Sequence, residues 1–202
     1  MTYRLYHMQS SGNCWKPRVA LHQLGHAFEL IDIDIMTGQS RTDDYLAMNP
    51  NGRVPLLQLP DGRHLAESNA MLAYLADGTD LMPSDRYDRG VVFQWMFFEQ
   101  YSHEPYIAVA RYWRHLEGKE PPEAVPGQIE ERGYAALGVM EQRLNEATFF
   151  AGDTYSIADI ALYAYTHVAH EGGFSLEAYP NIRAWLQRVA ATPRFVDMDW
   201  RP

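Results

Sequence analysis

The hydrophobic pattern changes partway along the chain, and its first part mixes two periodicities. Short apolar or alternating runs, typical of strands, lie between segments with the spacing of amphipathic helices. The strand-like runs are residues 3–7, 28–35, 54–59 and 64–66, and the helix-like segments are 13–25, 41–50 and 67–77. The order β-α-β-α-β-β-α predicts a mixed α/β domain over residues 1–78.

From about residue 85 the spacing is helical throughout, which predicts a second, all-α domain over residues 85–202. The longest apolar helical segment covers 89–116, and we expect it to bend at Pro105, which has no N–H for the helix ladder. Further helices are predicted at 129–147, 155–171 and 179–193, with a linker at 77–85. Ser156 and Asp159 have the spacing of a capping box, which we interpret as a structural element.

Charge narrows the range of partners. The chain has 17 basic and 26 acidic residues, a net charge of −9. Such a surface repels nucleic-acid phosphates and anionic membranes, so the sequence predicts neither partner. No apolar run is long enough to span a bilayer, the first residues lack the pattern of a signal peptide, and Cys14 is the single cysteine. We therefore expect a cytoplasmic protein.

Two short stretches carry candidate chemistry. Pro55 stands at the head of a predicted strand, where proline cannot donate to the sheet. It either blocks pairing at an edge strand or belongs to a functional turn. Glu67-Ser68 begins a predicted helix, where free N–H groups and the helix dipole favour an anion, although the pair is also an ordinary helix start.

Four stretches in this order resemble the cytosolic glutathione transferase family, and the resemblance spans essentially the whole chain. They are LYHMQSSGN (5–13), NPNGRVPLL (49–57), ESNAMLAYLAD (67–77) and GDTYSIADIALYAY (152–165). The resemblance implies a thioredoxin-like domain followed by an all-helical domain. It also implies a homodimer, glutathione as co-substrate, and conjugation of the glutathione sulfur to a hydrophobic electrophile.

The resemblance assigns glutathione-binding roles to residues of the first domain. It implies a cis bond between Val54 and Pro55, with the backbone of Val54 pairing to the tripeptide as an added strand. It places the γ-glutamyl end of glutathione at Glu67-Ser68. Its glycine carboxylate is expected near the basic side chains of Arg41 and Arg53.

The chemistry requires a thiolate, and an ordinary thiol with a pKa of about 8.5 is only about 3% ionised at neutral pH. Lowering that pKa by about 2 units takes roughly 2.7 kcal/mol, and one hydroxyl donating to the anion supplies about 1.5–3 kcal/mol. By position, Ser11 matches the serine of theta-like and zeta-like transferases, and Asn13 matches an asparagine of a bacterial class. Ser10 and Cys14 stay open as alternatives.

The electrophile is expected against the aromatic-rich helical half, at Tyr101, Tyr106, Arg111 and Tyr112. Two other functions stay open: a glutathione-dependent disulfide or peroxide reductase or isomerase, and a non-catalytic ligand-binding or regulatory member of the same fold. No metal is predicted, because the paired histidines lack a third ligand at a useful spacing.

Overall fold

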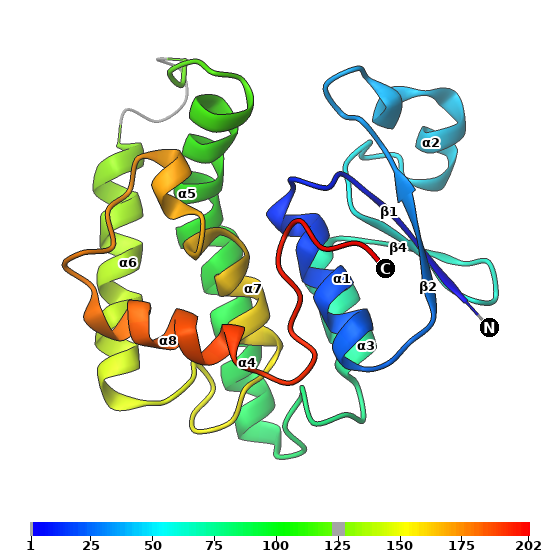
Figure 1. Cartoon of the computed structure of the whole chain (residues 1–202). Helices are drawn as coiled ribbons and strands as arrows, with labels where there is room; N and C mark the ends of the chain where they lie inside the picture. Colours follow the sequence, from blue (N-terminus) through cyan, green and yellow to red (C-terminus); the bar gives the residue numbers. More distant parts are fainter. Residues whose placement is uncertain (1, 123–127) are drawn as a thin grey trace. The chain divides into compact units, whose positions relative to one another are not determined.

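A computed structural model describes residues 2–122 and 128–202, and it divides the chain into two units (Figure 1). The first unit consists of residues 1–77 together with 192–202, and the second consists of residues 78–191. Each unit has its own buried apolar core, as expected for independent domains.

The first unit is built on a four-stranded mixed sheet. Its strands are β1 (Tyr3–His7), β2 (Phe28–Asp32), β3 (Leu56–Gln58) and β4 (His64–Ala66), in the spatial order β2-β1-β3-β4. β1 and β2 are parallel, whereas the β1–β3 and β3–β4 pairs are antiparallel. The predicted order β-α-β-α-β-β-α and the thioredoxin-like fold class are confirmed.

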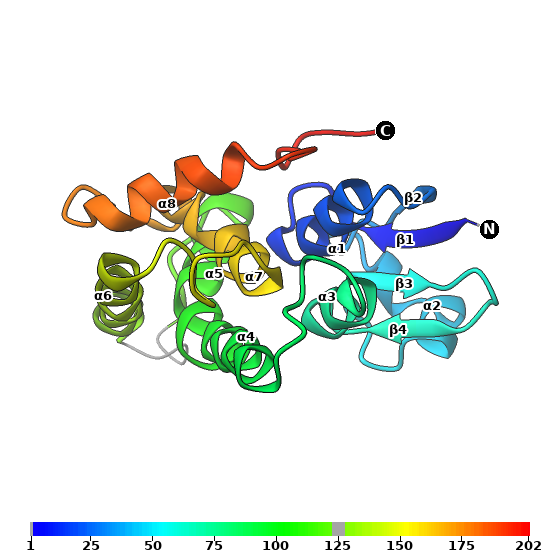
Figure 2. The same ribbon diagram turned by 90° about the horizontal axis from the view of Figure 1, so that it is seen from below.

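Two helices of this unit cover one face of the sheet. α1 (Gly12–Gln23) and α3 (Ser68–Ala76) pack side by side, as both views show (Figures 1 and 2). The short 3₁₀ turn η1 (Gln39–Arg41) and α2 (Asp43–Met48) lie between β2 and β3 in the chain. Leu5 and Leu57, paired across β1 and β3, are fully buried. Burying each such side chain stabilises the fold by about 1.5–3 kcal/mol.

The last eleven residues belong to a different unit from the one expected from the sequence. The helical domain was expected to run to Pro202, but residues 192–202 belong to the first unit. The physical reason is hydrogen bonding from α1 to the backbone of this segment, for example from Trp15 Nε1 to the Val196 carbonyl at 2.8 Å. We call residues 192–202 the C-terminal strap.

The second unit is entirely helical apart from an isolated bridge between Phe149 and Gly152, within the ranges that the structure describes. Its helices are α4 (Arg86–Phe98), α5 (Glu104–Arg111), α6 (Ile129–Glu146), α7 (Ile157–Thr166) and α8 (Pro180–Ala190), with shorter turns η2 (Glu99–His103), η3 (Tyr112–Leu116) and η4 (Ala169–Gly172). None of the helices described is both long and apolar enough to cross a bilayer.

A widened helical turn lies just before Pro105, and the bend expected there stays a prediction. η2 is a π-type turn, in which the Glu104 N–H donates to the Glu99 carbonyl five residues earlier. Pro105 falls in the first turn of α5, where a missing N–H is tolerated. Because α5 begins directly after η2, Pro105 lies in a first helical turn, and its missing N–H removes no hydrogen bond from a helix interior.

The predicted capping box at the start of α7 is present. The Ser156 side chain accepts from the Ala158 N–H, and Asp159 accepts from the Ser156 N–H at 3.0 Å. Asp159 also accepts from the Phe150 N–H at 3.1 Å and from Trp185 Nε1 at 2.9 Å. Burial raises the pKa of Asp159 to about 6, and these hydrogen bonds oppose that rise. Asp159 thus ties α7 to α8 inside the unit.

Candidate functional site

The strand register brings three chain segments to one edge of the sheet. Leu56 in β3 pairs with Tyr6 in β1 on one side and with Ala66 in β4 on the other. The segment that leaves β1, the segment that enters β3 and the segment that leaves β4 therefore meet at the same end. These segments carry Ser11, Val54-Pro55 and Glu67-Ser68, which lie far apart in the sequence.

Ser11 ends a tight turn and begins α1. Its N–H donates to the Met8 carbonyl at 3.1 Å, which closes the turn of residues 8–11. Its side chain is the N-cap of α1 and accepts from the Cys14 N–H at 3.4 Å. The cap uses the Ser11 oxygen only as an acceptor, and its O–H points to the buried Cys14 sulfur, where it lowers the pKa of that thiol. A rotation of the hydroxyl hydrogen away from Cys14 would let Ser11 donate to a bound anion while the cap stays in place.

Asn13 links the starts of two helices. Its side-chain oxygen accepts from the Ser68 hydroxyl at 3.2 Å, and Ser68 is the first residue of α3. The two N-terminal helix ends therefore stand close together, and both present partial positive charge. A fully buried lysine, Lys16, adds a cation here and donates to Asn69 at 3.4 Å. Sequence reasoning missed Lys16, because a lysine on a helix is usually exposed.

The peptide bond between Val54 and Pro55 is cis, as the resemblance implied. The carbonyl of Arg53, just before it, accepts from the Tyr45 hydroxyl and from Asn49 Nδ2, both at 2.8 Å. These two bonds fix the backbone at Arg53, the residue that precedes Val54. Within residues 2–122 and 128–202, no hydrogen bond is found to the backbone of Val54 itself. Its N–H and C=O can therefore pair with an extended peptide.

Glu67 has an unusual backbone conformation, with φ at 68° and ψ at 113°. A residue other than glycine in this region stores about 1–3 kcal/mol of strain, and such residues cluster at functional sites. Glu67 is exposed, directly precedes α3, and its side chain makes no capping bond to the helix. The strained residue therefore places its own carboxylate at the sheet edge where the three segments meet.

Arg41 and Arg53 are both exposed. Arg41 donates to the Asn51 carbonyl at 3.0 Å, and so braces the turn that leads into Arg53. The structure thus brings both basic residues to the segment before Val54. Their contact with a glycine carboxylate stays a prediction.

The four residues predicted for the electrophile have different environments in the helical unit. Tyr101 is 84% exposed, whereas Arg111 is buried and paired with the carboxylate of Glu171. The hydroxyls of Tyr106 and Tyr112 each bond a side chain of the same unit. The charge of Arg111 is therefore already balanced, and the role of these four residues stays a prediction.

Two alternatives can be compared with the structure. Cys14 is fully buried, and burial raises the pKa of its thiol to about 11, although hydrogen bonds from Ser11 and from the Met8 N–H oppose the rise. Such a thiol is neutral at pH 7 and cannot act as a nucleophile. Among the described residues, no group of three or more His, Cys, Asp or Glu side chains could hold a metal ion.

A thioredoxin-like unit with a cis-proline edge, followed by an all-helical unit, defines the class of this protein. Residues 5–80 match the family described as Glutathione S-transferase, N-terminal domain, and residues 95–193 match Glutathione S-transferase, C-terminal domain. The chain belongs to the glutathione S-transferase family.

Individual relatives agree with this assignment. The crystal structure of a glutathione S-transferase from Pseudomonas fluorescens Pf-5 is 52% identical and has a TM-score of 0.93, covering 97% of this chain and 98% of that one. "Glutathione S-transferase F13" of Arabidopsis thaliana is 30% identical over 209 residues, 97% of this chain and 94% of the relative. "Disulfide-bond oxidoreductase YfcG" of Escherichia coli K12 is 29% identical over 176 residues, 82% and 80% of the two chains.

The environment of Cys14 predicts a slow reaction with thiol reagents. At pH 7, a pKa of about 11 leaves about 300-fold less thiolate than an ordinary cysteine has, before burial is considered. We expect the native protein to react with an aromatic disulfide reagent at least about 300-fold more slowly than the unfolded protein. The rate is measured from the absorbance of the aromatic thiolate that the reagent releases. Rapid labelling of the folded protein would contradict this environment and restore Cys14 as a candidate nucleophile.

Proposed function

We propose that this protein is a glutathione transferase in which Ser11 stabilises the glutathione thiolate for attack on a hydrophobic electrophile. The observation that carries the proposal is the convergence of the Ser11 turn, the backbone of Val54 and the Glu67-Ser68 helix start at one sheet edge. Family membership supplies the ligand class.

Glutathione would bind through its backbone and both of its ends. Its cysteine N–H and C=O would pair with Val54, extending the sheet edge by a short strand. Its γ-glutamyl carboxylate would accept from the N–H groups at the start of α3 and from the Ser68 hydroxyl, which would turn away from Asn13 on binding, while the Glu67 carboxylate would pair with the ammonium. Its glycine carboxylate would be neutralised by Arg53 and Arg41. Each charged end thereby meets the opposite charge.

The reaction needs the sulfur as an anion. The Ser11 hydroxyl donates to it, which contributes about 1.5–3 kcal/mol, and the nearby start of α1 adds about 0.3–1 kcal/mol. Together these reach the roughly 2.7 kcal/mol that lowers a thiol pKa by about 2 units. The thiolate then forms a bond to the electrophilic carbon, the leaving group departs with its electron pair, and the thiol proton passes to solvent.

A second candidate function is disulfide reduction by glutathione. The similarity to the E. coli disulfide-bond oxidoreductase favours it, and the side-chain N–H of Asn13 is the alternative donor to the sulfur. In that reaction the glutathione thiolate attacks one sulfur of the disulfide, which forms a mixed disulfide and releases the other sulfur as a thiolate. A second glutathione thiolate then attacks the glutathione sulfur of the mixed disulfide, which forms oxidised glutathione and releases the second substrate thiolate. The cytoplasmic location predicted from the sequence fits a supply of reduced glutathione.

We also propose that the protein is a homodimer. A row of exposed side chains follows one face of α4 into η2, and it includes three large aromatic residues: Tyr87, Phe97 and Tyr101, which are 78%, 70% and 84% exposed. Aromatic side chains at this exposure are typical of protein interfaces. A second copy of the same chain is the occupant that the family implies.

The role of Ser11 is tested by the Ser11→Ala variant. Loss of one hydroxyl donor to a thiolate is expected to lower kcat/KM with an activated aryl chloride by roughly 10- to 150-fold, and to raise the pKa of the bound thiol. Ser84→Ala, an exposed serine outside the site, is the matched control and should retain full activity. Equal activity of Ser11→Ala and wild type removes Ser11 from the mechanism.

The same preparations separate the other functions. Turnover of a disulfide far above that of the aryl chloride would establish the reductase instead. Failure of glutathione to raise the melting temperature would indicate a non-catalytic member, because a ligand that binds the native state must stabilise it.

The dimer is tested by the particle mass in solution. Light scattering should give about twice the 23.2 kDa of the chain. The double variant Tyr87→Glu/Phe97→Glu should reduce that mass to the monomer value, because it buries charge at the interface. Val139→Glu, an exposed apolar position on α6, is the control. A monomeric wild type, or a dimeric double variant, contradicts this interface.

A further inference from the structure

The C-terminal strap is bound to α1 by a series of hydrogen bonds. Four α1 side chains, spaced so that they share one side of the helix, bond four successive points along the strap. They are Gln23 to Thr192 Oγ1 at 2.9 Å, His22 with the Arg194 carbonyl at 2.9 Å, Trp15 to the Val196 carbonyl at 2.8 Å and Arg18 to the Met198 carbonyl at 2.6 Å. The strap is therefore part of the first unit along its full length.

The far end of the strap reaches the turn that carries Ser11. Gln9 is a central residue of the turn of residues 8–11. Its side-chain amide donates to the Met198 carbonyl at 2.6 Å and to the Trp200 carbonyl at 3.3 Å. The Trp200 ring is held in turn by the His22 ring, with centroids 4.6 Å apart. Gln9 is thus fixed from outside its own turn.

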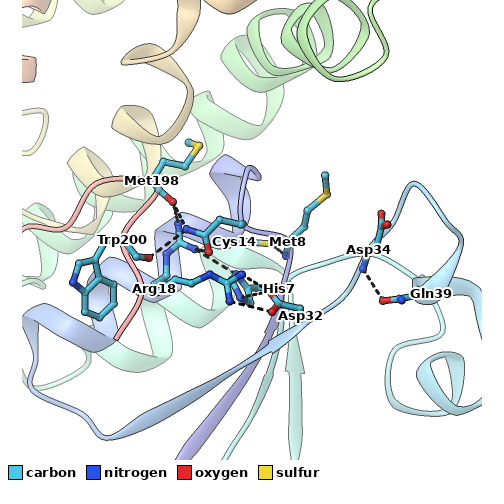
Figure 3. A network of polar contacts seen from close by, with 11 residues as sticks. His7, Met8, Cys14, Arg18, Asp32, Asp34, Gln39, Met198 and Trp200 are labelled. Atoms are coloured by element: carbon cyan, nitrogen blue, oxygen red, sulfur yellow. Dashed lines mark hydrogen bonds and ion pairs between the residues drawn. The ribbon is translucent and has the colours of Figure 1, made fainter.

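Arg18, Gln9 and the Met198 carbonyl are joined to one another by hydrogen bonds, so Arg18 also links the turn to the strap. Its side chain is fully buried and donates to Gln9 Oε1 at 3.0 Å. It also donates to the Met198 carbonyl at 2.6 Å and to His7 Nδ1 at 3.3 Å (Figure 3). Since a guanidinium can only donate, His7 Nδ1 accepts and the His7 proton lies on Nε2. That nitrogen faces Asp32 at 3.2 Å.

The network closes through the last residues of the strap. Arg201 forms a two-point ion pair with Asp32, at 2.7 and 3.1 Å. Both side chains are half exposed, so the pair contributes modestly by itself. Its effect is geometric, because it joins the strap to the end of β2 while Arg18 joins the strap to β1 and α1. The strap therefore connects His7, the last residue of β1, to the turn that follows it.

We propose that the C-terminal strap positions the Ser11 hydroxyl, with Gln9 as the positioning residue and Arg18 as its support. This inference rests on the proposed role of Ser11. In the turn of residues 8–11 the Ser11 N–H donates to the Met8 carbonyl and the Met8 N–H donates to the Cys14 sulfur. Gln9 adds the bonds from the turn to the strap. Displacing a catalytic group by about 1 Å costs up to about 100-fold in rate, so a fixed turn matters.

The test compares two glutamines that bind opposite ends of the strap. Gln9→Ala removes the bonds to the Met198 and Trp200 carbonyls and the bond that Gln9 accepts from Arg18, all next to the Ser11 turn. Gln23→Ala removes bonds to Thr192 and the Pro193 carbonyl, at the other end. Both variants remove hydrogen bonds to the strap, but only Gln9→Ala removes bonds between the strap and the turn that carries Ser11. The readout is the pKa of the bound glutathione thiol, followed by thiolate absorbance as pH is varied, alongside kcat, KM and melting temperature.

We expect Gln9→Ala to raise the thiol pKa by about 1 unit and to lower kcat about tenfold at pH values below the wild-type thiol pKa, where one pKa unit changes the thiolate fraction by that factor. The KM for glutathione should change less than about threefold, because its carboxylate contacts lie elsewhere. Gln23→Ala should match wild type in thiol pKa and kcat. A chain ending at Asp197, which lacks the Met198 and Trp200 carbonyls, should reproduce Gln9→Ala.

The outcomes separate this inference from the proposed function. A wild type that does not lower the thiol pKa of bound glutathione refutes the role of Ser11 itself. A raised thiol pKa in Ser11→Ala together with a wild-type thiol pKa in Gln9→Ala contradicts the positioning role of the strap and leaves the role of Ser11 intact. Equal shifts in Gln9→Ala and Gln23→Ala also contradict the positioning role of the strap, because they would show general loosening of the unit.

Discussion

The candidate site depends on the pairing of Leu56 with strands on both of its sides. Because Leu56 pairs with Tyr6 and with Ala66, the exits of β1 and β4 and the entry to β3 share one edge. The cis bond before Pro55 begins β3 at that edge and leaves the backbone of Val54 unpaired within the described chain. A shift of one residue in either pairing would turn the side chains to the opposite face and move these segments apart.

Around this edge, the local chemistry is arranged for anions. Two helices begin there, joined by the bond between Asn13 and Ser68, and each contributes N–H groups and the positive end of its dipole. A chain with a net charge of −9 can hold an anionic tripeptide only through such a local site. The strained backbone of Glu67 directly precedes α3, and the buried Lys16 of α1 donates to Asn69 in the first turn of α3.

Much of this arrangement could be predicted from the sequence, and the exceptions have physical reasons. Local patterns predicted the element order, the Ser156–Asp159 capping box and, through the family resemblance, the cis bond before Pro55. The C-terminal strap was missed because its bonds join side chains to carbonyls about 180 residues away, which leaves no periodicity in the sequence. The aromatic-rich helical segment was equally ambiguous, since spacing does not distinguish exposed Tyr101 from buried Arg111.

The most direct test of the central claim is a crystal structure of the protein with glutathione bound. The account predicts that the cysteine N–H and C=O of glutathione pair with the backbone of Val54, and that the Ser11 hydroxyl is the nearest donor to the sulfur. A tripeptide bound away from Val54, or a sulfur whose nearest donor is another residue, would contradict it.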